Sequence, residues 1–265
     1  MTRPIVASIG FGAMAASLAA SLARNPDGPQ LGGALVRPGS SAPLRPGLQR
    51  WTDVADLIAA RPRLVVECAT HQAVQDTVPA LLSAGIDVAI VSVGALARPG
   101  LPERIEAAAR QGGARATVVS GAIGGLDVLR AARHAGLDQV TYIGRKPPAA
   151  WKGTPAEAIV DLDRLAEARC FYEGTAFEAA RDYPKNTNVT AAVALAGVGF
   201  AKTRVQLIAD PTAQGNMHEL QASGPFGSFH ITLHNTALPE NPKTSWLAAL
   251  SVEQAVIRHF SPLEI

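Results

Sequence analysis

Short, continuous apolar runs alternate with helical patterns through the first half of the chain. The apolar runs cover residues 4–9, 31–36, 64–68, 87–93 and 116–120, and the helical patterns cover residues 15–24, 51–60, 72–84 and 102–111. Apolar runs without polar alternation are typical of parallel strands that helices cover on both faces. The pattern therefore predicts an α/β fold whose first domain, residues 1–126, is a doubly wound parallel sheet of the Rossmann type.

From residue 127 onward the pattern predicts a second domain, residues 127–240, of the α+β class. Helices are expected over residues 127–135, 155–168, 176–181 and 189–197, and strands over residues 140–143 and 203–209. Residues 218–223 and 228–236 alternate polar and apolar side chains on either side of a Gly-Pro-Phe-Gly turn, as a β-hairpin does. We therefore expect a mainly antiparallel sheet with helices on one face. The segment 241–265 carries a final helix, residues 244–260, which we expect to pack back on the first domain.

The first predicted strand leads into Gly10-x-Gly12-x-x-Ala15, the spacing of a dinucleotide-binding turn. Gly10 permits the tight turn, Gly12 lets a pyrophosphate approach the backbone, and Ala15 keeps the helix close to the strand. The N–H groups at the N-terminus of the following helix bind anions. A glycine turn that binds nothing is the alternative, but the position directly after a strand favours a cofactor site. The residues expected to form it are Gly10, Phe11, Gly12, Ala13 and Met14.

The end of the second predicted strand bears on the choice between NAD and NADP. An acidic residue at this position binds the ribose hydroxyls of NAD, whereas an arginine suits the 2′-phosphate of NADP. The chain has Arg37 here, followed by Ser40 and Ser41. This favours NADP, or the use of both cofactors, and a solvated loop arginine is the alternative interpretation.

Composition narrows the class of protein. Of 265 residues, 48% are hydrophobic and 17% are charged, and the formal net charge is +2. A substantial core can therefore form, and no basic block favours a nucleic acid or a membrane surface as a partner.

The two cysteines, Cys68 and Cys170, are too few for a disulfide scaffold, so we expect a reducing, cytoplasmic compartment and structural thiols. The apolar start resembles a secretory signal, but Gly10 and Gly12 interrupt it, so we interpret it as the first strand and helix of a soluble protein.

Three polar segments in the second half of the chain carry more functional groups than their local structure needs: residues 185–188, 215–219 and 241–245. Asn186 or Asn188 either caps the helix that follows or bonds a nicotinamide or a substrate carboxylate. In the third segment, Lys243 either pairs with a carboxylate or is solvated. Thr244 or Ser245 is expected to cap the final helix.

Among the six histidines, His218 is the best candidate for proton transfer. Its unperturbed pKa of about 6.5 suits a general acid or base near neutral pH, although the local sequence is equally compatible with a structural histidine. His230 and His234 face the same side of the predicted hairpin, but no Cys, Asp or Glu joins them at ligand spacing, so we expect no metal site. His71 is expected to cap the helix after the third strand, or to touch cofactor or substrate.

Several motifs, in order along nearly the whole chain, together resemble those of the L-aspartate dehydrogenases. They are Gly10-Phe11-Gly12-Ala13-Met14, Val66-Glu67-Cys68-Ala69, Ser120-Gly121-Ala122-Ile123-Gly124-Gly125-Leu126-Asp127, Pro184-Lys185-Asn186-Thr187-Asn188-Val189, Asn216-Met217-His218-Glu219 and Asn241-Pro242-Lys243-Thr244-Ser245. The resemblance implies NAD(P)-dependent oxidative deamination of L-aspartate, through iminoaspartate, to oxaloacetate and ammonia, in a reversible reaction. It also implies a homodimer, and a link to NAD biosynthesis because iminoaspartate is a quinolinate precursor.

By position, the resemblance also implies roles for individual residues. His218 matches the catalytic histidine of the family, and Ala122 and Asn188 match its cofactor contacts. We add Ala69, at the end of the third predicted strand, to the expected cofactor contacts. The substrate carboxylates are expected to be held by donors of the polar segments, namely Lys185, Asn186, Lys243, Thr244 and Ser245.

Two other functions compete with this interpretation. An enzyme like dihydrodipicolinate reductase would require a His-His pair followed by a lysine, and the chain has no His-His pair. A non-catalytic NADP sensor would need the first domain but not the three polar segments of the second half. An assay with L-aspartate and both cofactors distinguishes these functions.

Overall fold

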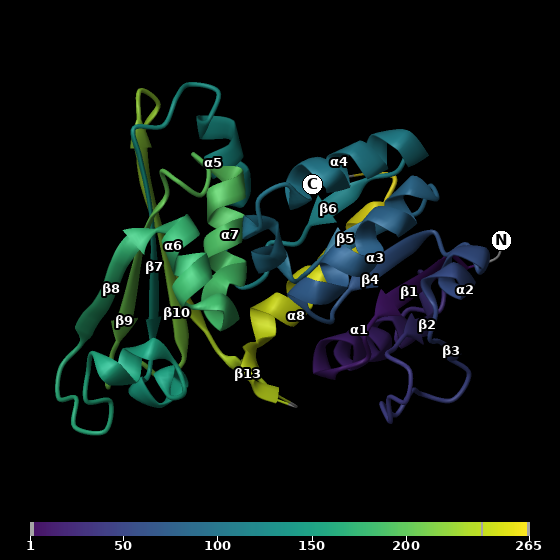
Figure 1. Cartoon of the computed structure of the whole chain (residues 1–265), viewed down its shortest axis with the longest axis horizontal. Helices are drawn as coiled ribbons and strands as arrows, with labels where there is room; N and C mark the ends of the chain where they lie inside the picture. Colours follow the sequence, from purple (N-terminus) through teal and green to yellow (C-terminus); the bar gives the residue numbers. More distant parts are fainter. Residues whose placement is uncertain (1–2, 240, 264–265) are drawn as a thin grey trace. The chain divides into compact units, whose positions relative to one another are not determined.

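A computed structural model of the chain describes residues 3–239 and 241–263, apart from the side chains of Lys185, Pro242 and Lys243. The chain forms two compact units (Figure 1): Met1–Val119 together with Ala249–Ile265, and Ser120–Ala248. Each unit is built around one large sheet. Within the described residues, no helix combines the length and the apolarity that a membrane span requires.

The first unit contains a six-stranded sheet in the order β3-β2-β1-β4-β5-β6, and its strand pairings are parallel. Its strands are β1 (Ile5–Ile9), β2 (Gln30–Leu35), β3 (Gln49–Trp51), β4 (Leu64–Glu67), β5 (Asp87–Ile90) and β6 (Ala116–Val118). The helices that alternate with them are α1 (Ala13–Ala23), α2 (Val54–Ala59), α3 (His71–Ser83) and α4 (Leu101–Gly112), with the 3₁₀ turn η1 (Val93–Ala97) after β5. This strand order is that of a doubly wound Rossmann sheet, so the predicted fold of the first domain is confirmed.

The last helix, α8 (Trp246–Phe260), contributes to the core of the first unit. Val252 and Val256 are fully buried in the same apolar cluster as Val6 of β1 and Leu18 of α1. Burying a valine side chain contributes about 1.5–3 kcal/mol relative to leaving it exposed. The prediction that the C-terminal helix packs back on the first domain is therefore confirmed.

The second unit contains a five-stranded sheet in the order β11-β10-β7-β9-β8. Its strands are β7 (Gln139–Lys146), β8 (Arg169–Thr175), β9 (Arg204–Ala209), β10 (Asn216–Gly224) and β11 (Gly227–Asn235). Helices α5 (Leu126–Ala132), α6 (Ala176–Asp182) and α7 (Thr187–Ala196) lie on one side of this sheet (Figure 1). Strands β7 and β9 run parallel, and the other three pairings are antiparallel. The predicted α+β domain with a mainly antiparallel sheet is confirmed.

Short elements complete the second unit. They are the 3₁₀ turns η2 (Pro148–Trp151), η3 (Pro155–Ala158) and η4 (Pro184–Asn186), and the two-stranded sheet of β12 (Ala237–Leu238) and β13 (Asn241–Ser245). The helix predicted over residues 155–168 is wrong, since η3 ends at Ala158. The Asp161 carboxylate accepts the backbone N–H groups of Asp163 and Arg164 and so closes a turn in place of a helix. Strand β8 is absent from the prediction, and Cys170 lies exposed on it.

Two helices begin later than predicted. Trp51 pairs in the short strand β3, and α2 begins only at Val54. Asp53 caps this helix, because its carboxylate accepts the N–H of Ala55 at 2.8 Å. The final helix begins at Trp246 and not at residue 244, because the residues before it form β13.

Candidate active site

Strands β7 and β10 place His218 and Tyr142 on one face of the sheet in the second unit. In the antiparallel register of these strands, His218 lies opposite Gly144 and Leu220 lies opposite Tyr142. Since side chains alternate along a strand, Tyr142, Gly144 and His218 share a face, and Arg145 lies on the other. This shared face is the buried one: His218 is 4% exposed and Tyr142 is 2% exposed.

The His218 ring is held by Tyr142. The Tyr142 hydroxyl oxygen and Nδ1 of His218 are hydrogen-bonded at 2.8 Å, and the two rings stack with centroids 5.9 Å apart. Gly144 makes room for this contact, because a Cβ atom at that position would lie 2.9 Å from the Tyr142 hydroxyl. Burial raises the pKa of Tyr142 above its usual value, so its hydroxyl stays protonated.

Lys146, the last residue of β7, brings an amino group to the same face. Its Nζ donates a hydrogen bond to Oδ1 of Asn186 and lies 4.9 Å from the centroid of the Trp151 ring. The side chain is partly buried, and burial lowers the pKa of Lys146 to about 8. Sequence reasoning missed this residue, because it stands in a Pro- and Lys-rich stretch that resembles a solvated loop.

Burial and a neighbouring charge act together on His218. Burial lowers the pKa of His218 to about 3, and the positive charge of Lys146 contributes to the same shift. The imidazole is therefore neutral over the whole physiological range of pH. The expectation of an unperturbed pKa near 6.5 is therefore wrong: in this environment the imidazole is a weaker proton acceptor than a solvated histidine. The neighbouring ammonium group of Lys146 can help to hold an anionic substrate.

Asn186 and Asn188 stand at the start of α7. Asn186 occupies the capping position, but its side chain makes no capping hydrogen bond and instead accepts one from Lys146. The capping interpretation is therefore wrong for Asn186, and the side chain lies in the site. Thr187 helps to fix this turn, since its hydroxyl donates to the carbonyl of Pro184 at 2.9 Å. Asn188 is exposed in the first turn of the helix.

The loop that carries Ala122 is fixed to strand β11. The Ala122 carbonyl accepts a hydrogen bond from the side-chain amide of Asn235 at 2.9 Å. Gly125 in the same loop has a φ of +77°, and a Cβ there would lie 2.2 Å from Cδ1 of Ile231. The positive φ favours glycine at this position, and a side chain there would also displace the end of the Ile231 side chain. The backbone of Ala122 is thus held in a defined place on the second unit.

The third polar segment lies in β13 and is linked to β10. The Ser245 hydroxyl accepts a hydrogen bond from the Asn216 amide at 3.4 Å, and the Thr244 hydroxyl accepts one from Asn241 at 3.0 Å. Ser245 is buried. The side chains of Lys185 and Lys243, two expected carboxylate donors, lie outside the part of the chain that the structure describes.

The glycine turn of the first unit fits a dinucleotide pyrophosphate. Gly10 has a φ of +80°, and a Cβ there would lie 3.0 Å from Cβ of Ala69. An ideal Cβ on Gly12 would meet no atom within 4 Å, so a side chain there would fill the space in front of the turn. Helix α1 starts at Ala13 with no side-chain cap and no acidic residue in its first turn. Its terminal N–H groups are thus suited to an anion.

A buried carboxylate, Glu67, supports the turn from the next strand. It is fully buried and accepts hydrogen bonds from the N–H of Ala69 at 2.8 Å and from the N–H and hydroxyl of Ser92 at 2.8 and 2.9 Å. Burial raises the pKa of Glu67 in spite of these bonds. The role of Glu67 is absent from the sequence prediction, although an acidic residue that ends a strongly apolar run is a visible signal.

The structure also places Arg37 and His71, the two other candidate residues of the first unit. Arg37 is exposed and lies two residues beyond the end of β2. The capping role expected for His71 is wrong, because the Thr70 hydroxyl caps α3 by accepting the N–H of Ala73 at 3.2 Å. His71 is the first residue of that helix.

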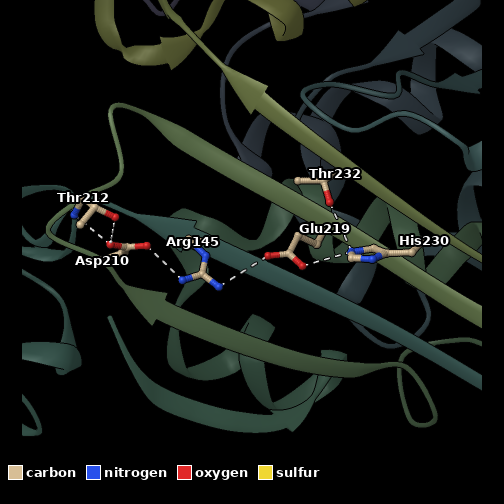
Figure 2. A network of polar contacts seen from close by, with 6 residues as sticks. All are labelled: Arg145, Asp210, Thr212, Glu219, His230 and Thr232. Atoms are coloured by element: carbon tan, nitrogen blue, oxygen red, sulfur yellow. Dashed lines mark hydrogen bonds and ion pairs between the residues drawn. The ribbon is translucent and has the colours of Figure 1, made fainter. Parts of the chain in front are cut away.

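The opposite face of the second sheet carries a separate polar network (Figure 2). It links Thr212, Asp210, Arg145, Glu219, His230 and Thr232. The Arg145 guanidinium lies 3.0 Å from Asp210 and 3.7 Å from Glu219, so two carboxylates balance its charge. His230 bonds Glu219 at 3.2 Å. In the described parts of the chain, no group of three or more His, Cys, Asp or Glu side chains is arranged to hold a metal ion.

The fold and the glycine turn define the class of protein as a two-domain oxidoreductase that uses NAD or NADP. Residues 10–119 match the family model described as "Homoserine dehydrogenase, NAD binding domain". Residues 127–259 match the model described as "Aspartate dehydrogenase, C-terminal". The chain belongs to the L-aspartate dehydrogenase family.

Similar proteins support this assignment over most of the chain. An L-aspartate dehydrogenase of Cupriavidus necator is 52% identical over 80% of this chain and 79% of its own length. One of Ruegeria pomeroyi is 47% identical over 96% and 92%. The crystal structure of aspartate dehydrogenase from Thermotoga maritima has a TM-score of 0.78 and 26% identity, and covers 99% of both chains. A hyperthermophilic archaeal homoserine dehydrogenase in complex with NADPH, at 11% identity and a TM-score of 0.62, shares the fold alone.

Proposed function

We propose that the protein catalyses the reversible oxidative deamination of L-aspartate, through iminoaspartate, to oxaloacetate and ammonia. The observation that carries this proposal is the buried His218, held by Tyr142 and beside the amino group of Lys146, in a member of the L-aspartate dehydrogenase family. The neutral imidazole provides a proton acceptor, and the ammonium group provides a counter-charge for an acidic substrate.

We assign cofactor binding to the glycine turn and to three further positions. The cradle of the pyrophosphate is formed by Gly10, Phe11, Gly12, Ala13 and Met14, and its fit rests on the uncapped start of α1 and the open space at Gly12. Ala69, Ala122 and Asn188 are the further contacts that we propose. A bound NAD or NADP would supply the acceptor for the hydride of the substrate Cα. Arg37, exposed after β2, is the residue that we propose to accept a 2′-phosphate.

We assign proton transfer to His218. It takes the proton of the substrate amine, or it activates the water that hydrolyses the imine. Nε2 can accept a proton only if Nδ1 carries the ring hydrogen, so we propose that Nδ1–H donates to the Tyr142 hydroxyl oxygen. Tyr142 is then a positioning residue, which fixes the tautomer and the orientation of the ring.

The donors proposed for the substrate carboxylates are those of two polar segments: Lys185, Asn186, Lys243, Thr244 and Ser245. The contact of Asn186 with Lys146 supports its assignment, and so do the hydrogen bonds that orient the hydroxyl groups of Thr244 and Ser245. An oriented donor binds a carboxylate with less loss of entropy than a mobile one.

We also propose a cytoplasmic homodimer that acts without nucleic-acid or membrane partners. The two cysteines, which are free thiols, support a reducing compartment, and the net charge of +2 gives no electrostatic reason for binding nucleic acid. Of the predicted domains, residues 1–126 are proposed to bind the cofactor and residues 127–240 to bind substrate, catalyse and dimerise. The chain divides at slightly different positions, with Ser120–Ala248 in the second unit, so only the part of the segment 241–265 from Ala249 onward returns to the first. Iminoaspartate released from the enzyme would feed NAD biosynthesis.

The direct experiment is incubation of the protein with L-aspartate and either NAD or NADP. We expect reduced nicotinamide to form together with equal amounts of ammonia and oxaloacetate. L-alanine, which lacks the second carboxylate, is the matched control and should react far more slowly. Tight cofactor binding without aspartate-dependent reduction would contradict the proposal and favour an NADP sensor.

A further inference from the structure

We propose that Lys146 binds a carboxylate of the substrate and thereby selects acidic amino acids. The inference rests on the proposed function, because it assigns one charged group of aspartate to one residue of the same site. Lys146 is not among the carboxylate donors that the sequence motifs indicate. It is the last residue of β7, and its role follows from its neighbours in the fold.

In the part of the chain that the structure describes, the surroundings of Lys146 lack a balancing negative charge. Its Nζ contacts the neutral amide of Asn186 and the face of the Trp151 ring. Among the described residues, no Asp or Glu oxygen lies within 4.0 Å of this nitrogen. A partly buried ammonium group without a counter-ion is costly, and an anion that arrives from solution removes this cost. The site is therefore organised for a ligand that brings a carboxylate.

The neighbours of Lys146 also fix its position. Trp151 is fully buried, and its indole N–H donates to the carbonyl of Ile208 at 3.1 Å, so the ring over which the ammonium lies is held rigidly. Asn186 approaches from the turn before α7. A charged group held from two sides binds a carboxylate with little loss of side-chain entropy.

Lys146 lies near the reacting group. On β7 it is two residues beyond Gly144, which is paired with His218, so both side chains belong to one face of the sheet. Its charge is close enough to lower the pKa of His218. A carboxylate on Lys146 would neutralise that charge and so make His218 a better proton acceptor. Substrate binding and proton acceptance are thereby coupled through one ammonium group.

The test is the binding of succinate, a dicarboxylate that cannot be oxidised at an amine, measured by calorimetry with the cofactor-saturated protein. We expect Lys146→Gln to weaken succinate binding at least about tenfold, the effect of losing a charge-assisted hydrogen bond. The affinity for NAD or NADP should not change. Lys152→Gln is the matched control, since Lys152 is exposed and pairs with Asp163 at 2.5 Å. If Lys146→Gln does not fold, Lys146→Met is used in its place, because methionine keeps an apolar side chain beside Trp151.

A second measurement uses the unaltered protein. Near pH 8.5 succinate binding should take up protons, because a carboxylate on Lys146 raises the pKa of an ammonium group that burial has lowered to about 8. Among the described residues, the other titratable side chains on this face or against Trp151 are Tyr142, Tyr172, Tyr183 and His218. None of them changes its charge near that pH, because the pKa values of the tyrosines are raised and that of His218 is lowered. Calorimetry in buffers of different ionisation enthalpy counts the protons.

Equal succinate affinity of folded Lys146→Gln and the parent protein would overturn the inference, and so would the absence of proton uptake or of any succinate binding. A loss of kcat for aspartate with unchanged KM would also overturn it, because it would assign Lys146 to proton transfer. The proposed function fails in a different way. A protein that binds succinate through Lys146 but does not oxidise aspartate would retain this inference and lose the aspartate reaction. The selection of acidic amino acids is tested with L-alanine, which lacks the side-chain carboxylate. Lys146→Gln should leave its weak turnover unchanged, and a reduced turnover would show that Lys146 holds the α-carboxylate and would overturn the selection.

Discussion

The Tyr142 hydroxyl lies 2.8 Å from Nδ1 of His218, and both side chains are buried. One strand thus fixes the ring that the neighbouring strand carries. The contact engages Nδ1 and leaves Nε2 as the nitrogen through which His218 can exchange a proton. Gly144 is required beside it, since a Cβ there would lie 2.9 Å from the hydroxyl.

Removing the Tyr142 hydroxyl should reduce turnover. In Tyr142→Phe the His218 ring loses the bond that selects its tautomer, a bond worth about 1–1.5 kcal/mol, so kcat for aspartate should fall about tenfold. Steady-state kinetics measure this, and cofactor affinity should stay the same. Tyr172→Phe, on β8, is the control and should be close to normal. A normal kcat in Tyr142→Phe would remove Tyr142 from the mechanism.

The low pKa of His218 should make the fold sensitive to acid. The pKa is about 3 in the folded protein and about 6.5 in the unfolded chain, so between these values the unfolded chain binds the extra proton. Stability is therefore lost as pH falls below about 6.5. Between pH 7 and pH 5, the free energy of unfolding should drop about 2 kcal/mol more in the parent protein than in His218→Gln.

Urea unfolding at the two pH values measures this difference. His134→Gln, at an exposed position, is the control for the loss of a histidine. Parallel pH profiles for the parent protein and His218→Gln would show that His218 is not held in its neutral form by burial and by Lys146.

Glu67 should link stability to cofactor binding. Glutamine at this position turns an N–H donor toward a backbone N–H of Ala69 or Ser92, which costs about 1–3 kcal/mol. We expect Glu67→Gln to melt at a lower temperature and to bind NAD or NADP more weakly, because Ala69 is then less well placed. Thermal unfolding with and without cofactor measures both effects. The exposed Glu103→Gln is the control, and equal behaviour of the two variants would exclude a positioning role.

Arg37 tests the choice of cofactor. If it binds the 2′-phosphate, Arg37→Asp should weaken NADP binding about 10–100-fold, the cost of one charge-assisted contact, and leave NAD binding nearly unchanged. Fluorescence titration with each cofactor measures this. Arg45→Asp, also exposed on the loop after β2, is the control for a general effect of charge. Unchanged NADP affinity in Arg37→Asp counts against the phosphate contact.

The fold of the first domain could be predicted because its signals are local. Apolar runs, glycine turns and alternating helices identify a parallel sheet without knowledge of the pairing. The structure of residues 155–168 could not be predicted in this way, because the turn at Asp161 overrides a helical composition. Strand β8 could not be predicted either, because it forms by pairing with β9 at the edge of the sheet.

The candidate site could be predicted only in part. His218 and Asn186 stand in polar segments that attract attention, whereas Tyr142 and Lys146 stand in an apolar run and in a Pro- and Lys-rich stretch. What unites these residues is the register of β7 against β10 and the position of η4, and both depend on contacts across 40 or more residues. A single sequence carries no signal for such pairings.

The most direct test of the proposed role of His218 compares His218→Ala with the parent protein in two assays. One assay measures turnover of L-aspartate, and the other measures the dissociation constant of the cofactor. If His218 transfers the proton, turnover should fall about 10²-fold or more, with little change in cofactor affinity. Near-normal turnover in folded His218→Ala would contradict proton transfer by His218.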